Sequence, residues 1–155
     1  MRLSLIFILL LGSLKPATAQ DWSLSTAIGA SYSGVNHNLR LHKSFNRWDA
    51  SIGPSFNYSK NKLPWSAKPG INMQTGFSLI DSGAIQSSAF FSYLLLPIQE
   101  ATIHEVYVGY TMFFELSNKW KATNSVGFGG YEERADQYSF NGLSYCINFG
   151  LSYRL

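Results

Sequence analysis

The sequence predicts an all-β fold, an eight-stranded antiparallel up-and-down transmembrane β-barrel that follows a cleaved signal peptide. Three observations support this prediction. The chain begins with the layout of a secretory signal, and apolar and polar residues then alternate along nearly all of the remainder. The connections between the alternating segments are short at one side and long at the other. A closed barrel suits such strands, because it pairs every backbone group internally when it crosses a membrane.

The N-terminal 19 residues form the predicted signal peptide. Arg2 gives a short basic start, residues 3–11 form an apolar run, and Ala17-Thr18-Ala19 supplies a small-residue cleavage site. The run is too short to span a bilayer as a helix, which argues against a retained anchor. We therefore expect a signal peptide at residues 1–19 and a single barrel domain at residues 20–155.

Composition excludes several classes of protein. The net charge is +3 and falls to +1 when Arg2 and Lys15 leave with the signal, so the chain lacks a basic field for nucleic acid. Charged residues make up 14% and aromatic residues 15% of the chain, which fits neither a disordered segment nor an ordinary soluble surface. No long apolar run follows the signal. The only cysteine is Cys146, so no internal disulfide is available to an exported chain.

Each predicted strand has one face of large apolar residues and one of small polar residues. Residues 22–32 place Trp, Leu and Ile on one side and mainly Ser, Ala and Gly on the other. The phase is less regular only around "FFSYLLL". The predicted strands are residues 22–32, 37–45, 48–58, 71–79, 84–96, 106–116, 120–128 and 143–155.

We assign the large apolar face to lipid and the small polar face to the lumen. An eight-stranded barrel has room inside only for side chains that fill it, so the small residues fit within. A secreted, soluble, lipocalin-like barrel with the opposite polarity is the alternative. Ser87 and Asn124 depart from the pattern, since both would face lipid, either at a subunit contact or beside a bulge that shifts the phase.

The connections and the aromatic residues orient the barrel. Residues 46–47, 81–83 and 117–119 are tight hairpins, whereas residues 61–70, 97–104 and 131–142 are expected to be long loops. Both termini then lie on the short-turn side, which is the periplasmic side of an outer-membrane barrel. The predicted aromatic girdle on that side comprises Trp22, Phe45, Trp48, Trp120 and Tyr153, and the opposite one Tyr32, Tyr58, Tyr93 and Phe128.

The last eight residues, "NFGLSYRL", resemble the C-terminal insertion signal of outer-membrane barrels. Asn148, Gly150, Tyr153 and Leu155 match its pattern, although Leu155 replaces the usual terminal Phe. The whole mature chain resembles the small eight-stranded barrels of the OmpA/OmpX type in Gram-negative bacteria. The resemblance implies localisation in the cell outer membrane and contact with its lipid and lipopolysaccharide. It also implies that the barrel-assembly machinery inserts the chain. The resemblance does not determine a function.

No catalytic, cofactor or metal site is predicted. "HKS" at residues 42–44 is similar to the His-x-Ser pair of lipid A deacylases, but His42 and Ser44 fall in the lumen phase near the periplasmic end. His37, His104 and Glu105 adjoin predicted loops, lack the spacing of a metal site and are expected at the surface. A deacylase-like enzyme and a narrow pore remain the alternatives to a structural or binding role.

Two groups of residues are the candidate functional sites. Glu115 should lie directly across from Lys121 in the lumen, close enough for an ion pair. The predicted lumen charge network at the periplasmic mouth comprises Asp21, Asp49, Glu115, Lys121 and Arg154. Contacts with a partner, a ligand or a larger envelope assembly are expected at the loop residues Trp65, Glu132, Glu133 and Arg134.

Overall fold

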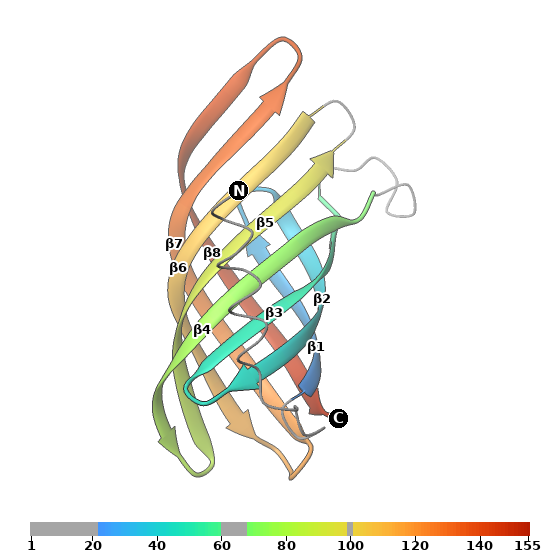
Figure 1. Cartoon of the computed structure of the whole chain (residues 1–155). Coiled ribbons are helices and arrows are strands. Elements are labelled where there is room, and N and C mark those ends of the chain that lie inside the picture. The colour runs from blue at the N-terminus through green and yellow to red at the C-terminus, as the bar shows by residue number, and fades with distance from the viewer. Residues whose placement is uncertain (1–21, 60–67, 99–100) are drawn as a thin grey trace, which may run out of the picture.

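The computed structural model describes residues 22–59, 68–98 and 101–155, which form eight antiparallel strands closed into one barrel in chain order (Figure 1). In this part of the chain, no helix has the length and apolar character needed to cross a membrane. The predicted signal peptide lies outside the described residues. The strands are β1 (Trp22–Ser31), β2 (Gly34–Phe45), β3 (Trp48–Asn57), β4 (Gly70–Ser82), β5 (Ile85–Ile98), β6 (Ala101–Glu115), β7 (Trp120–Ala135) and β8 (Ser139–Arg154).

The last strand closes the barrel against the first. β1 pairs with β8 from Ser23 opposite Arg154 to Ala30 opposite Ile147. The backbone N–H of Leu155 continues the closure beyond the strand and donates to the Trp22 carbonyl at 3.1 Å. Over this stretch closure removes the free edges of β1 and β8, which would otherwise be sites for aggregation.

The two faces have the predicted polarity. On β1, Leu24 and Ile28 are 51% and 59% exposed on the outside, whereas the inward Ser25 is 4% exposed. The same contrast recurs on the other strands, where buried serine and asparagine side chains fill the lumen. The prediction that large apolar residues face outward is therefore confirmed for most of the barrel.

The long loops predicted at residues 97–104 and 131–142 are mostly strand, which is a correction. β5 and β6 are separated only by residues 99–100, and β7 and β8 only by residues 136–138. Figure 1 shows the β7–β8 hairpin extending well beyond the β1–β2 hairpin. The polar residues that suggested loops belong to strands that project past the apolar band. Beyond that band the outer face of a strand does not contact lipid, so it does not have to be apolar.

A bulge interrupts the pairing of β4 with β5. Ser78 pairs with Ser88 and Ile80 pairs with Ser87, so Leu79 is the extra residue. The bulge lies beside Ser87, one of the two positions that departed from the expected pattern. Asn124 instead belongs to a regular stretch of β7, and the ladder places Ser87 and Asn124 on either side of Met112.

Candidate functional site

The barrel has two different ends. The short-turn end carries the turns at residues 46–47, 83–84 and 116–119 together with the C-terminus (Figure 1). The long-hairpin end carries the β5–β6 and β7–β8 hairpins and the two-residue turn Tyr32–Ser33. The candidate residues divide between these ends.

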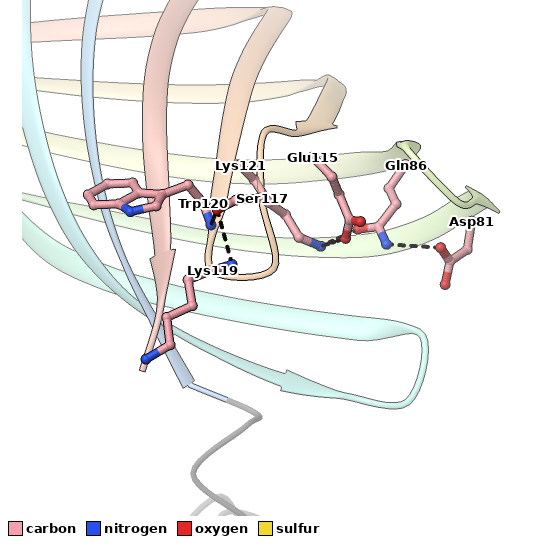
Figure 2. Close-up of polar contacts among 7 residues, drawn as sticks. All are labelled: Asp81, Gln86, Glu115, Ser117, Lys119, Trp120 and Lys121. Atoms are coloured by element: carbon pink, nitrogen blue, oxygen red, sulfur yellow. Dashed lines mark hydrogen bonds and ion pairs between the residues drawn. The ribbon is translucent and has the colours of Figure 1, made fainter.

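The predicted ion pair is present at the short-turn end (Figure 2). Glu115 pairs with Lys121 in the β6–β7 register, and Lys121 Nζ lies 3.3 Å from Glu115 Oε1. Lys121 Nζ also donates to Gln86 Oε1 at 2.6 Å, and Gln86 Nε2 donates to Asp81 Oδ1 at 2.9 Å. These four residues form the short-turn network. Gln86 and Asp81 were not predicted: Asp81 lies directly opposite Gln86 in the β4–β5 pairing, and Gln86 reaches Lys121 across β6.

The other members of the predicted charge network take different positions. Asp21 lies outside the described residues. In the described part of the chain, neither Asp49 nor Arg154 forms an ion pair or a side-chain hydrogen bond with Glu115 or Lys121. The Asp49 carboxylate lies over Gly76, where a Cβ would come within 2.3 Å of Asp49 Oδ2. Of the four predicted members that the structure describes, only Glu115 and Lys121 form an ion pair with each other.

Aromatic side chains surround the short-turn end as predicted. Trp120 packs against Tyr153 with ring centroids 4.9 Å apart, and Trp48 packs edge-on against Phe77 at 5.0 Å. Phe77 belongs to the same girdle and was not predicted, although it has the outward phase. The opposite girdle needs one correction. Tyr58, Tyr93 and Phe128 belong to the outer face, but Tyr32 packs against the apolar cluster inside the barrel.

The predicted insertion-signal residues take part in closing the barrel. Asn148 and Gly150 pair with Gly29 and Ala27 of β1 on the lumen face, and Tyr153 faces outward against Trp120. Leu155 makes the terminal backbone bond already described. Their role as a signal to the assembly machinery remains a prediction.

The middle of the lumen is filled by Phe90. Its ring lies across two facing glycines, Gly109 and Gly127, where a Cβ would come within 2.7 and 2.9 Å of Phe90 Cζ. Tyr107 and Cys146 pack against it, and all three side chains are buried. A cavity of about 20 Å³ adjoins this cluster, and a second of about 10 Å³ lies elsewhere in the lumen, beside Arg40 and Phe113; each is the size of about one water molecule.

Glu105 was expected at the surface but is fully buried in the lumen. Its Oε1 accepts the backbone N–H of Ser33 at 2.9 Å, and its Oε2 accepts the hydroxyl of Tyr107 at 2.9 Å. The Tyr107 hydroxyl also contacts Ser144 Oγ at 2.8 Å. Glu105 follows the alternation of Tyr107 and Gly109, and that phase was the signal that could have placed it inside.

The turn Tyr32–Ser33 covers the lumen at the long-hairpin end. The Tyr32 backbone donates to Ser144 Oγ at 3.2 Å, its hydroxyl donates to Glu133 Oε2 at 2.9 Å, and its ring stacks on Tyr131 at 3.4 Å. Burial and the Glu133 carboxylate raise the pKa of the Tyr32 hydroxyl above its usual range, which keeps it a donor. Beneath the turn lies an apolar cluster of Leu94, Leu96, Ile98 and Ile103.

The predicted loop contacts are strand residues of the β7–β8 hairpin, and Trp65 lies outside the described residues. Arg134 Nε lies 2.7 Å from Glu132 Oε1 on the exposed side, whereas Glu133 bonds to Tyr32. Two exposed aromatic rings, those of Tyr138 and Phe140, pack against each other near the hairpin end, with centroids 5.1 Å apart. A groove of about 600 Å³ lies alongside, with Lys68, Arg134 and Asp136 among its lining residues.

The three histidines each have a hydrogen-bond partner. His42 Nε2 bonds to Ser25 Oγ at 2.5 Å, so its observed partner is Ser25 and not the Ser44 of the deacylase-like string. His37 bonds to Thr26 at 2.7 Å and His104 to Tyr93 at 2.7 Å. Within the described ranges, no group of histidine, cysteine and acidic residues could hold a metal ion.

Comparisons with known proteins agree with this geometry. No protein-family model matches the chain, and no curated protein matches it. The chain is similar in structure to the N-terminal β-barrel domain of OprF from Pseudomonas aeruginosa, with a TM-score of 0.60, 5% identity and coverage of 86% of this chain and 97% of that one. It is also similar to Neisserial surface protein A, with a TM-score of 0.50, 9% identity and coverage of 86% and 94%. The fold is that of the small eight-stranded outer-membrane β-barrels.

Proposed function

We propose that this chain is an integral outer-membrane protein of binding or structural type, closed to the passage of solutes. In this proposal the long-hairpin end faces outside the cell and the short-turn end faces the periplasm. Lipid and lipopolysaccharide surround the apolar band, and the barrel-assembly machinery inserts the chain. The β7–β8 hairpin contacts a ligand or an envelope protein, and no chemical step is assigned to the chain.

The observation that carries the proposal is the filled outer half of the lumen. Phe90 lies across the middle, Glu105 holds the Tyr32–Ser33 turn over the end, and the apolar cluster containing Leu96 and Ile103 occupies the space between. Interior-filling side chains are typical of eight-stranded barrels, whereas water-filled channels belong to larger ones. These contacts favour a binding or structural role over a pore.

The exposed surface of the β7–β8 hairpin supports the binding part of the proposal. A strand crosses a bilayer with about 9–11 residues, whereas β7 and β8 have 16 each. The surplus carries the adjoining rings of Tyr138 and Phe140 and the Glu132–Arg134 pair. Aromatic residues and arginine are enriched in protein contact surfaces relative to the rest of the protein surface.

Conductance across planar bilayers tests the closed lumen. We expect the purified mature protein to add no ion current, because side chains fill the outer half of the barrel. The double variant Phe90→Ala/Leu96→Ala, checked for folding by circular dichroism, should conduct and so prove that the assay detects an opened lumen. A steady current through the unaltered protein, equal to that through the variant, would contradict the proposal.

A further inference from the structure

A cavity of about 260 Å³ opens at the short-turn end, opposite the filled half of the lumen. Its volume is close to the lower limit of small-molecule sites, about 300 Å³. Its lining includes His42, Ser88 and Phe113 on the lumen faces of three strands, with charged residues from the turns around them. Nothing in the binding role proposed for the hairpins uses this cavity.

Among the described residues, four cationic side chains line this cavity, against the two carboxylates of Asp49 and Asp81. Lys121 is neutralised by Glu115 within the short-turn network. Arg47, Lys119 and Arg154 also line the cavity, and no carboxylate of the described residues forms an ion pair with any of the three.

The neighbours of two of these cations are aromatic. The Arg47 guanidinium lies 5.5 Å from the centroid of the Phe77 ring, and Lys119 Nζ lies 5.6 Å from that of Tyr153. Contacts of this kind hold the side chains in place and leave their charge uncompensated. The Arg47 and Lys119 side chains are therefore held near the rim of the cavity, and Arg154 adds a third cation to its lining.

A buried hydroxyl supplies a second, independent observation. Ser88 lines the cavity and is 3% exposed, and its Oγ has no hydrogen-bond partner among the described residues. A buried polar group without a partner costs free energy, so such groups are uncommon in folded proteins. An acceptor atom placed in the cavity would remove that cost.

We propose that this cavity binds a small organic molecule carrying an oxyanion, either a carboxylate or a phosphate. The guanidinium groups of Arg47 and Arg154 suit such a group, because their planar donors match two of its oxygens. The Ser88 hydroxyl donates to the buried part of the ligand. The site takes its ligand from the periplasm if the barrel has the orientation proposed above.

Calorimetric titration of the purified mature protein in detergent tests the site. The probes are succinate for a carboxylate and glycerol 3-phosphate for a phosphate, with succinamide and glycerol as uncharged counterparts. We expect saturable binding of at least one anion and of neither uncharged probe, and the preferred anion identifies the oxyanion. Saturation by both uncharged probes, or by no probe, would overturn the proposal.

Three variants locate the binding. Arg154→Gln and Arg47→Gln should each weaken binding of the anion about tenfold, which corresponds to the loss of one charge-assisted hydrogen bond. Lys68→Gln is the control, because it removes one positive charge from an exposed residue at the opposite end of the barrel and should leave the affinity unchanged. Equal weakening in all three variants would mean general charge attraction and would overturn the site.

Cysteine protection keeps the proposal testable if an arginine variant does not fold. Ser88→Cys in a Cys146→Ala background places one thiol inside the cavity. A small thiol reagent should modify it more slowly, in proportion to occupancy, when the bound anion is present. Modification at the same rate with and without a saturating anion would contradict the site.

Discussion

At the residue scale, Lys121 shows how a charge is held inside the lumen. Glu115 neutralises it and Gln86 accepts a second hydrogen bond, while Gln86 in turn donates to Asp81. The side chains of Lys121 and Glu115 are 19% and 37% exposed, so water screens part of the attraction. The pair therefore contributes only modestly to stability.

The Glu115–Lys121 pair yields the prediction at this scale. Glu115→Gln should lower the free energy of unfolding by about 0.5–1 kcal/mol, because Lys121 loses its counter-charge. Adding Lys121→Met should recover part of the loss, since removing both partners of a pair usually costs less than stranding one. Thermal unfolding in detergent compares the unaltered protein, the two single variants and the double variant. Strictly additive effects of the two changes would refute the coupling.

At the element scale, β8 decides whether the sheet is closed. Near the short-turn end, the chain forms backbone hydrogen bonds on both sides of β8. The Arg154 N–H donates to the Lys119 carbonyl at 2.8 Å, and the Leu155 N–H donates to the Trp22 carbonyl. Tyr153 adds packing against Trp120. The opposite end of β8 only pairs with β7 beyond the closed part of the barrel.

Two variants, one deletion and one turn replacement, test the different roles of the two ends of β8. Removing residues 153–155 should prevent stable closure, because β1 loses pairing along its first residues and the terminal bonds are lost. Replacing residues 136–138 by Asn-Gly should leave folding intact, because these residues connect β7 and β8 beyond the stretch in which β8 pairs with β1, and Asn-Gly suits a hairpin. Folding yield in detergent, measured by circular dichroism, compares them. Normal folding of the first variant and failure of the second would contradict this division.

At the scale of the whole molecule, the apolar band and the two unlike ends determine how the barrel sits in a membrane. The outer face exposes large apolar side chains such as Ile28, Val108 and Phe149, an arrangement suited to lipid. Aromatic rings surround the short-turn end, and the hairpins extend beyond the band at the other. These features define an axis along the membrane normal.

Location and orientation are tested together in cells. We expect the mature chain to fractionate with the outer membrane and to migrate faster on gels before heating than after it, because the closed barrel stays compact. With Ser139→Cys, an impermeant thiol reagent should label intact cells, whereas Ser117→Cys should need a permeabilised outer membrane. Recovery as a soluble protein without detergent contradicts the location, and the reverse labelling pattern contradicts the orientation.

The sequence by itself determined the strand number, the polarity of the two faces and one side-chain pair. Period-two alternation follows directly from strand geometry, so the large residues of β1 and β3 could be assigned to the outside. The Glu115–Lys121 pair was predictable because a short hairpin fixes which residues are opposite. The strands predicted for β6, β7 and β8 were too short at the long-hairpin end, since polar residues beyond the apolar band look like loops although they continue the strands.

Only the tertiary structure decided what fills the two halves of the lumen. The pairing of β5, β6 and β7 places Phe90 over Gly109 and Gly127, and the closed barrel brings Ser33 of the first turn to Glu105 of β6. The alternation of apolar and polar residues predicts which side chains point inward, but the residue that each one meets across the barrel depends on strand tilt and stagger. The cavity lined by Arg47 and Arg154 has the same origin, because these residues are far apart in sequence and meet only when the sheet closes.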